Sequence, residues 1–257
     1  MLKDKIVVVT GASSGIGALT AQMLSERGAV VILTARSVDK LQNVGSALKG
    51  PHAVIPMDVS QDDDVTRVMD SIIGTYGRID VLLNNAGYGK FEYCKDMPLS
   101  EFADMMNVNY MGIVRCTKSV LPHMMKAGSG QIVNVASMAG KIGTSKSTAY
   151  TATKHAVLGF TNALRPEVKE YGITVSAVNP GPIDTPFFQL ADPGGEYVKN
   201  IGWFMMKPEK VAAAIVSVIE RRKAEVDLPW AAGIGIRLYQ LFPRLADKLS
   251  SRMLNKK

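Results

Sequence analysis

Two residues with complementary chemistry, Tyr150 and Lys154, stand four positions apart in the stretch AYTATK at 149–154. On a helix this spacing places both side chains on one face, where they can contact each other or one bound molecule. A phenol can give or take a proton, and an ammonium beside it favours the phenolate and lowers its pKa from the usual value of about 10. A lone Y-x-x-x-K pattern also occurs on ordinary exposed helices, so its meaning depends on the rest of the chain.

A glycine-rich stretch, TGASSGIG at 10–17, follows the apolar run IVVVT at 6–10. Here Gly11 permits a tight turn, Gly15 lets the backbone approach a pyrophosphate, and Gly17 allows close packing of the following helix, whose N-terminus attracts anions. A plain strand-to-helix turn is the alternative, because a glycine loop alone is a weak signal. The candidate dinucleotide-binding residues of this stretch are Gly11, Ser13, Ser14, Gly15, Ile16 and Gly17.

The second apolar run ends in TARS at 34–37, where NAD-binding folds usually place a carboxylate for the adenosine ribose. No acid stands there. Arg36 and Ser37 instead offer a guanidinium and a hydroxyl that can bind a 2′-phosphate. The stretch therefore predicts NADP(H), and a solvated arginine in a turn is the alternative.

Polar and small residues also end the next two apolar runs. Asp58 and Val59 end the third run, and we expect the Asp58 carboxylate to accept the adenine amino group. Asn85, Ala86 and Gly87 end the fourth, at the sheet edge where ligands of such folds bind. Either stretch also fits a simple turn.

These motifs need a particular arrangement of strands and helices. Apolar runs of strand length lie at 6–10, 30–35, 52–59, 81–87, 131–137 and 173–181, and helical patterns lie near 15–27, 39–47, 62–76, 100–126, 148–171 and 208–223. Runs that are apolar throughout suit strands covered on both faces. The alternation predicts an α/β fold, a doubly wound, Rossmann-like parallel sheet with helices on both faces, formed by a single domain over residues 1–257.

Composition and charge limit the function classes. No apolar run reaches the length of about 18 residues that spans a membrane, and the N-terminus lacks a secretory apolar core. Cys94 and Cys116 provide neither a disulfide framework nor metal-ligand spacing, so we expect a cytoplasmic protein without a metal. Residues 221–257 carry six of the seven net positive charges, and no recognition motif accompanies them, so nucleic-acid binding is not predicted.

Seven motifs occur in register over residues 10–186, namely TGASSGIG, DVS, NNAG, NVNYMG, NVASMAG, YTATK and PGPIDTP. Together they resemble the short-chain dehydrogenase/reductase family. The resemblance implies a nicotinamide cofactor and a catalytic set that falls on Asn109, Ser137, Tyr150 and Lys154. It implies Tyr150 as the acid in carbonyl reduction or the base in alcohol oxidation, Ser137 binding the carbonyl oxygen, and Asn109 anchoring a water by its backbone carbonyl. Lys154 would favour the phenolate and hold the nicotinamide ribose.

The resemblance also places the nicotinamide carboxamide on PGPIDTP, with Pro180, Gly181, Ile183 and Thr185 as candidate cofactor-binding residues. Residues 187–207 resemble the family's variable substrate lid. Its candidate pocket-lining residues, for which core packing is the alternative, are Phe187, Phe188, Trp203, Phe204, Met205 and Met206. Two other features are not expected to take part in catalysis. His155 should point away from Lys154, and the acidic run at 62–64 should cap a helix.

The chain continues past the family's usual end as a basic, amphipathic extension at 233–257. Pro243 can begin a helix whose apolar stripe is flanked by cations; the stripe consists of Phe242, Leu245, Ala246, Leu249 and Met253. Packing on protein is favoured, and peripheral contact with an anionic membrane is the alternative. We expect a homodimer or homotetramer that reduces a hydrophobic ketone or aldehyde with NADPH. The alternative function is a dinucleotide-sensing or membrane-attached binding protein with little turnover.

Overall fold

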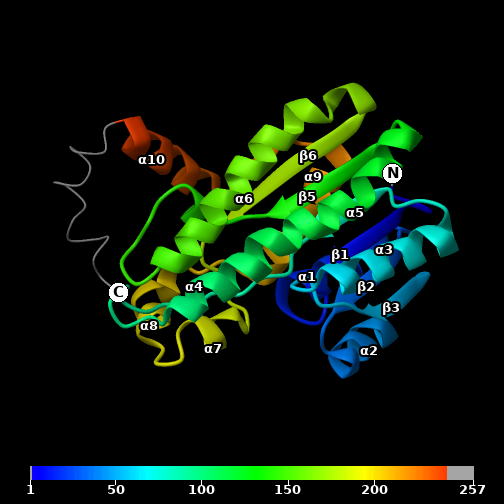
Figure 1. The fold of residues 1–257 in the computed structure, drawn as a ribbon. Coiled ribbons are helices and arrows are strands. Elements are labelled where there is room, and N and C mark those ends of the chain that lie inside the picture. Colours follow the sequence, from blue (N-terminus) through cyan, green and yellow to red (C-terminus); the bar gives the residue numbers. More distant parts are fainter. Residues whose placement is uncertain (1, 242–257) are drawn as a thin grey trace.

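Seven parallel strands form one sheet in the order β3-β2-β1-β4-β5-β6-β7 in the computed structural model, which describes residues 2–241 (Figure 1). The strands are β1 Ile6–Thr10, β2 Val30–Ala35, β3 His52–Pro56, β4 Val81–Asn84, β5 Gly130–Val135, β6 Ile173–Pro180 and β7 Glu225–Leu228. The strand order reverses between β1 and β4, which creates a crevice at the carboxyl ends of these strands.

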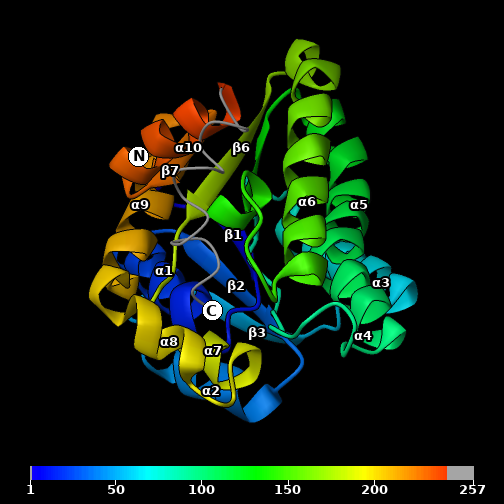
Figure 2. The ribbon, with the colours of Figure 1, turned by 90° about the vertical axis from the view of Figure 1, so that its left-hand side faces the viewer.

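Helices cover both faces of the sheet, as predicted. They are α1 Gly15–Glu26, α2 Val38–Ser46, α3 Asp62–Tyr76, α4 Leu99–Met106, α5 Gly112–Ala127, α6 Thr148–Glu167, α7 Phe187–Ala191, α8 Glu196–Ile201, α9 Pro208–Arg221 and α10 Trp230–Leu241. Buried side chains of α1, α2 and α9 belong to the core on one face, and those of α3, α5 and α6 to the core on the other. Figures 1 and 2 show α5 and α6 lying side by side on the second face.

The burial of strand β1 on both faces explains why its sequence is apolar. Val7 and Val9 join the core under α1 and α9, whereas Ile6 and Val8 join the core under α3 and α5. Successive strand side chains point to opposite faces, so a strand buried on both sides needs apolar residues at every position.

One predicted helix, 100–126, is divided in the structure. A π-helical turn at Asn107–Met111 separates α4 from α5, and the buried Asn109 lies at its centre. Sequence periodicity missed the turn because it inserts without a glycine or proline to mark it. Such single turns often occur at functional sites.

The C-terminal part differs most from the prediction. Helix α10 begins at Trp230, directly after β7, whereas the predicted helix from Pro243 lies outside the described residues. No helix within residues 2–241 is long and apolar enough to cross a bilayer.

The opposite edge of the sheet, where β1 and β4 begin, is tied together by Asp80. Its carboxylate accepts hydrogen bonds from the Lys5 ammonium at 2.9 Å, the Ile6 amide at 2.8 Å and the Arg78 guanidinium at 2.9 Å. Burial raises the pKa of Asp80, but these donors outweigh it, and the net effect is a lowered pKa.

Candidate active site

The glycine loop is fixed by residues at the ends of β1 and β4. The Thr10 hydroxyl accepts hydrogen bonds from the amides of Asn85 and Ala86 at 3.0 and 3.1 Å. The Asn85 side chain donates back to the carbonyls of Thr10 and Gly11 at 3.0 and 3.1 Å. Gly11 has a φ of +65°, and a Cβ there would lie 2.7 Å from the Ala86 Cα. Only glycine therefore fits at this turn.

A pocket of about 920 Å³ opens at the carboxyl edge of the sheet. It is lined by most of the candidate site residues: Gly11, Ser13, Ser14, Gly15, Ile16, Arg36, Ser37, Asp58, Val59, Asn85, Ala86, Gly87, Ser137, Tyr150, Lys154, Pro180, Gly181, Ile183 and Thr185. Two candidates lie behind the wall. Gly17 packs so closely against the Gly11 carbonyl that a Cβ would clash with it, and Asn109 is fully buried.

Arg36 and Ser37 line one end of this pocket, at the start of α2. Lys40, one helical turn further on, lines the same end and was not among the sequence candidates. Its signal was the spacing of four residues from Arg36, which places two cations at one βα junction. Asp58 lies nearby, with its carboxylate held by the amide and hydroxyl of Ser60 at 2.9 and 2.8 Å.

Tyr150 and Ser137 meet in the middle of the pocket. The Ser137 hydroxyl donates to the Pro180 carbonyl at 3.3 Å and accepts from the Ala139 amide at 3.1 Å. Burial raises the pKa of Tyr150 to about 12; a side-chain hydrogen bond between Tyr150 and Ser137 lowers it in part, and the nearby Tyr197 raises it further. At neutral pH the phenol therefore carries its proton.

The surroundings of Lys154 correct the expectation that this residue lowers the pKa of Tyr150. Its ammonium donates to the Val135 carbonyl at 2.9 Å and lies 5.7 Å from the centre of the Tyr150 ring, so the predicted pair is formed. The expected lowering of the Tyr150 pKa is absent, however, because burial dominates at both residues. Burial also lowers the pKa of Lys154 itself, to about 8, so its ammonium keeps its charge at neutral pH but does not offset the burial of the phenol.

Asn109 holds the floor of the site through its side chain. Its amide nitrogen donates to the Tyr88 carbonyl at 2.8 Å and to the Thr153 hydroxyl at 3.1 Å, and its oxygen accepts from the Tyr88 amide at 2.9 Å. The π-helical turn thus links the loop after β4 to helix α6. Thr153 lies between Tyr150 and Lys154 in sequence, so this link also fixes their helix.

The other end of the pocket is aromatic. Phe91 lies at its centre, with ring centroids 6.0 Å from Tyr150 and 5.0 Å from Tyr197. Of the six aromatic and methionine candidates in residues 187–207, three line the pocket, namely Phe187, Phe188 and Phe204. Trp203 is 85% exposed, and the two methionines pack elsewhere. The sequence missed Phe91 and Tyr197 because neither belongs to a motif.

Three loops meet around this aromatic end. The Phe91 amide donates to the Ala191 carbonyl, and the Glu92 amide donates to the Lys146 carbonyl, both at 2.9 Å. The Lys146 ammonium also pairs with Glu196 on α8 at 3.2 Å. The segment 187–207 is thereby attached to the loops that follow β4 and β5.

The residues to which the sequence assigns no catalytic role lie outside the pocket lining. The exposed His155 ring contacts the Thr151 carbonyl at 2.9 Å, pointing away from the site. The run Asp62, Asp63 and Asp64 forms the first turn of α3, where the Asp64 carboxylate accepts from the Asp58 amide at 2.7 Å. Within residues 2–241, no cluster of three or more metal-ligating side chains is present.

The pocket fits a dinucleotide. Within the described chain, no side chain caps the first turn of α1, although Ser14, Gly15 and Ile16 at this helix start all line the pocket. Uncapped N–H groups at a helix start attract phosphate. A Cβ on Gly15, whose φ is +55°, would meet Thr185 at 3.7 Å, so the loop and the 180–186 segment form one narrow cradle.

The parallel sheet, the pocket at its carboxyl edge and a sequence match together assign the chain to a family. Residues 5–194 match the family described as short chain dehydrogenase. The chain belongs to the short-chain dehydrogenase/reductase family and is an NAD(P)-dependent oxidoreductase.

Three known proteins illustrate this relationship. An uncharacterized oxidoreductase of Bacillus subtilis strain 168, YxnA, is 34% identical over 98% of this chain and 73% of its own. A short-chain dehydrogenase from Streptomyces avermitilis has a TM-score of 0.83 and 28% identity, covering 97% of both chains. A single-residue variant of the actinorhodin polyketide ketoreductase, solved with NADPH, has a TM-score of 0.80 and 29% identity over 87% of this chain and 95% of its own.

Proposed function

We propose that this protein is an NADPH-dependent reductase of neutral, hydrophobic ketones or aldehydes, which also catalyses the reverse oxidation. The observation that carries the proposal is one continuous pocket. It joins a basic end at Arg36 and Lys40, a protonated phenol at Tyr150, and an aromatic end around Phe91.

The preference for NADPH over NADH rests on two cations. Arg36 and Lys40 line the pocket where the second strand ends, and a guanidinium and an ammonium together favour a phosphate over a ribose hydroxyl. The structure of the similar polyketide ketoreductase with NADPH is consistent with this proposal.

Titration of the protein with NADPH and with NADH tests this preference. Charge-assisted hydrogen bonds contribute about 1.5–3 kcal/mol each, so Arg36→Ala should weaken NADPH binding by at least about tenfold and leave NADH binding nearly unchanged. Lys40→Ala should act in the same direction. Lys49→Ala, at an exposed lysine outside the pocket, is the matched control. Equal affinity of the wild type for both dinucleotides would remove the basis for NADP(H).

The chemistry follows from the central residues. A bound dinucleotide would supply hydride exchange at its nicotinamide ring. Tyr150 then acts as the general acid: its raised pKa keeps the phenol protonated at neutral pH, and a developing alkoxide is basic enough to take that proton. Ser137 lies beside Tyr150 and its hydroxyl can turn from the Pro180 carbonyl to the substrate oxygen.

Lys154 and Asn109 support these two residues. We assign the Lys154 ammonium to the ribose of the nicotinamide half, because it lines the pocket and is buried beside Tyr150. We assign Asn109 to holding the helix of Tyr150 and Lys154 in place through Thr153. A water bound at its backbone carbonyl stays a prediction from the family resemblance.

The substrate class follows from the charges of the lining. The charged side chains that could bind an anionic or cationic substrate are concentrated at the cofactor end of the pocket. The aromatic end is lined by Phe91, Phe187, Phe188 and Tyr197. No Asp, Glu, Lys or Arg is among the described residues that line this end. A charged carboxylate or phosphate would lose its hydration there without a counter-ion. Residues 187–207 therefore act as a lid over a neutral, apolar substrate.

Turnover with NADPH tests the reaction. A panel should contrast neutral ketones (1-tetralone, acetophenone, 2-decanone) with the charged ketones pyruvate and acetoacetate. We expect reduction of the neutral compounds, and a loss of about 100-fold or more in kcat for Tyr150→Phe, the typical contribution of general acid catalysis. Full turnover by Tyr150→Phe would refute the mechanism, and binding of NADPH without any turnover would favour a dinucleotide-sensing role.

A membrane-attached role is a second candidate because helix α10 exposes apolar residues. Trp230, Ile234, Leu238 and Leu241 follow one face of the helix and are 49–71% exposed. The following residues, 242–257, are basic in sequence, which suits an anionic lipid surface. Co-sedimentation with phosphatidylserine vesicles, lost in Leu238→Ser, would support attachment; a protein that stays in the supernatant would exclude it.

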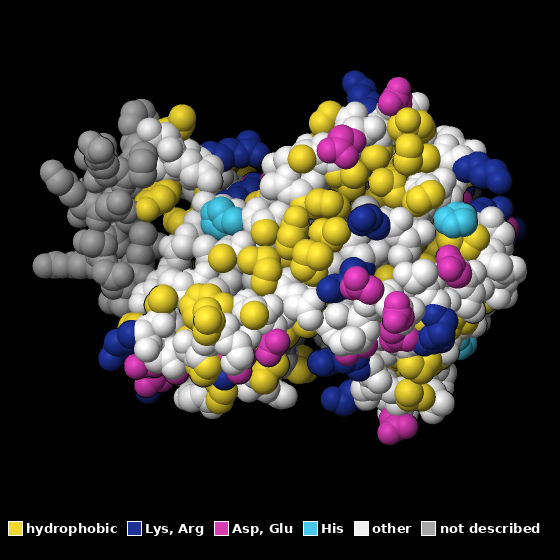
Figure 3. All heavy atoms as spheres, in the orientation of Figure 1, with side chains coloured by type: hydrophobic (Ala, Val, Ile, Leu, Met, Phe, Trp, Pro, Cys, Tyr) yellow, Lys and Arg dark blue, Asp and Glu magenta, His cyan; other side chains and the backbone are white. Residues whose placement is uncertain are grey.

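We further propose a homodimer formed through α5 and α6. Hydrophobic side chains gather on the surface where these two helices lie side by side (Figure 3), and half-buried apolar residues there include Leu121 and Phe160. Light scattering on the purified protein distinguishes a monomer from a dimer or tetramer, and a charged substitution such as Phe160→Glu should dissociate the assembly if this face forms it.

A further inference from the structure

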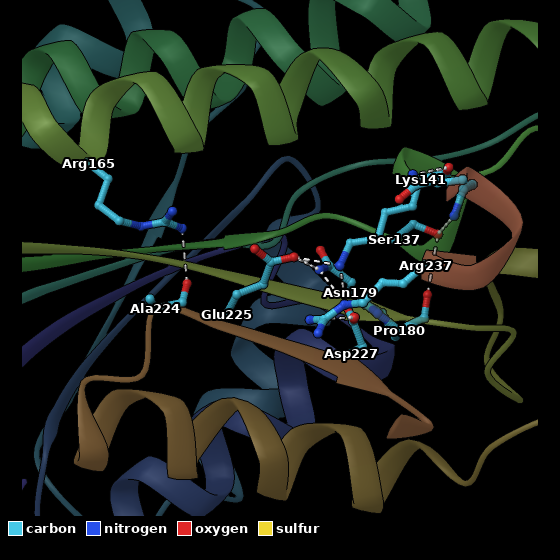
Figure 4. Close-up of polar contacts among 11 residues, drawn as sticks. Ser137, Lys141, Arg165, Asn179, Pro180, Ala224, Glu225, Asp227 and Arg237 are labelled. Carbon is cyan, nitrogen blue, oxygen red and sulfur yellow. Dashed lines mark hydrogen bonds and ion pairs between the residues drawn. The ribbon is translucent and has the colours of Figure 1, made fainter. Parts of the chain in front are cut away.

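A cluster of buried charges lies behind Ser137, outside the catalytic set. The Lys141 ammonium lies 2.5 Å from a carboxylate oxygen of Asp227 and 2.6 Å from one of Glu225. The Asn179 amide nitrogen donates to the same two oxygens, at 2.8 Å each. The side chains of Lys141 and Asp227 are only 13% and 8% exposed. Figure 4 shows the four side chains converging between the serine loop, β6 and β7.

The first connection between the cluster and Ser137 is the short chain segment from Ser137 to Lys141. Ser137 precedes the short 3₁₀ turn at Met138–Gly140, and Lys141 follows it directly. Within this turn, the Ala139 amide donates to the Ser137 hydroxyl at 3.1 Å. Fixing the Lys141 side chain therefore fixes the end of the same turn that holds the serine oxygen.

A second connection runs through β6. Asn179 directly precedes Pro180, whose carbonyl accepts the Ser137 hydroxyl at 3.3 Å (Figure 4). Because Asn179 is held by Glu225 and Asp227 on β7, the carbonyl partner of the serine is held as well. The donor and the acceptor of the Ser137 hydroxyl are thus both attached to one ionic cluster.

The orientation of Asn179 indicates how strongly the cluster dictates this geometry. Its amide nitrogen faces the two carboxylates, and its own oxygen is buried with no hydrogen-bond partner among the described residues. A buried polar atom without a partner is unfavourable, so the contacts with the carboxylates must outweigh it.

Helix α10 closes the cluster from the far side. The Gln240 side chain donates to the Lys141 carbonyl at 3.0 Å, and the Arg237 guanidinium lies 3.9 Å from Asp227. A Cβ on Gly233 would lie 2.6 Å from the same carboxylate, so the helix packs directly on Asp227. Helix α10 therefore covers the Asp227 side of the cluster, whereas Glu225 stays 30% exposed; exclusion of water from Lys141 and Asp227 strengthens their attraction.

We propose that Lys141, Asn179, Glu225 and Asp227 are positioning residues for Ser137. They do not touch the reacting atoms; they hold the turn and the carbonyl that fix the serine oxygen in place beside Tyr150. This inference rests on the proposed role of Ser137 in carbonyl reduction. Loss of the Lys141 ammonium would leave two adjacent carboxylates without their shared counter-ion, and their repulsion would move both partners of the serine.

A double-mutant cycle between Lys141→Met and Ser137→Ala tests the proposal, with NADPH and the neutral ketone of the above panel that is reduced fastest. We expect Lys141→Met to lower kcat at least tenfold in the wild-type background and less than twofold in the Ser137→Ala background. The dissociation constant for NADPH should change less than twofold. Lys141→Arg, which keeps the charge, should restore most of the rate.

The outcomes separate the two proposals. A Ser137→Ala variant with full turnover would contradict the role of the serine itself. Equal losses from Lys141→Met in both backgrounds, or no loss, would overturn the positioning role alone. If Lys141→Met does not fold, Lys141→Met with Asp227→Asn relieves the repulsion between the carboxylates. The loss of kcat that remains, from the missing ionic contact of Lys141, should appear when Ser137 is present and be absent in the Ser137→Ala background.

A crystal structure of Lys141→Met supplies a readout that needs no turnover. The Ser137 hydroxyl should no longer lie within hydrogen-bond distance of the Pro180 carbonyl. A serine in its wild-type position, with that hydrogen bond intact, would overturn the proposal.

Discussion

Burial of Lys154 should make the stability of this protein depend on pH in an unusual direction. Lowering the pKa of Lys154 from 10.5 to about 8 corresponds to about 3 kcal/mol, at about 1.36 kcal/mol per pKa unit. Below pH 8 both the native and the unfolded state carry the proton, and the native state bears this penalty in full. Between pH 8 and 10.5 the native state loses its proton while the unfolded state keeps it.

The unfolded state therefore binds more protons in this window, and the free energy of unfolding rises with pH. From this group alone the rise between pH 7 and pH 9 is about 1.3 kcal/mol. Burial also raises the pKa values of Tyr150, Tyr197 and Cys116 to about 12. These groups act in the opposite direction at higher pH, so the lysine contribution must be isolated by comparison.

Urea unfolding of the wild type and of Lys154→Met at pH 7, 8 and 9, without dinucleotide, isolates the contribution of Lys154 to the free energy of unfolding. The wild type should gain about 1.3 kcal/mol over the variant between pH 7 and pH 9. Lys118→Met, at an exposed position of α5, is the control, and its difference from the wild type should stay constant. A constant or falling difference for Lys154→Met would refute the reasoning, because it would mean that Lys154 is solvated or paired.

Three further substitutions have definite expected effects. Gly17→Ala places a Cβ in collision with the Gly11 carbonyl, so NADPH affinity measured by fluorescence titration should fall at least tenfold, by about 1.4 kcal/mol or more; unchanged affinity would show that the loop yields freely. Asp80→Asn should reduce the free energy of unfolding at pH 7 by about 1–3 kcal/mol, and the deficit should shrink as pH falls below 3.8 toward the lowered native pKa; a deficit that is independent of pH in acid titration would contradict this account. Phe91→Ala removes the ring 6.0 Å from Tyr150 and should raise KM for 1-tetralone with little change in NADPH affinity; a selective loss of NADPH binding would place Phe91 at the wrong end of the pocket.

The arrangement of the sheet was accessible from sequence because its central strands are largely apolar on both faces. Strand β1 matched its predicted range, Ile6–Thr10, since both of its faces are buried. The predicted runs at 52–59 and 81–87 were too long, because their last residues leave the sheet to line the pocket. Hydrophobicity alone does not separate a strand from the turn that follows it.

The site was predictable where a motif fixes residue identities, and less so where distant segments meet. The motif residues converge on one pocket, but Phe91 and Tyr197 became visible only when the chain was folded, and Lys40 was marked only by its spacing from Arg36. The pKa of Tyr150 was wrongly expected to be lowered, because sequence spacing reveals a neighbouring charge and not the burial of both groups. Helix α10 escaped prediction because Gly233 and Gly235 lower the helix propensity of its sequence.

The segment at 187–207 contributes Phe187, Phe188, Tyr197 and Phe204 to the pocket. Among the described residues it is attached through the loops after β4 and β5 and through the isolated bridge between Ile183 and Met206. Met206, at the end of this segment, exchanges backbone hydrogen bonds with Pro182 and Asp184, whereas the glycine loop is held by Thr10 and Asn85 without it. Replacement of this segment by another of different length or sequence should alter which compounds are accepted without dismantling the cradle. Substrate choice in this protein can thus diversify in evolution, or be grafted in the laboratory, as a module separate from cofactor recognition.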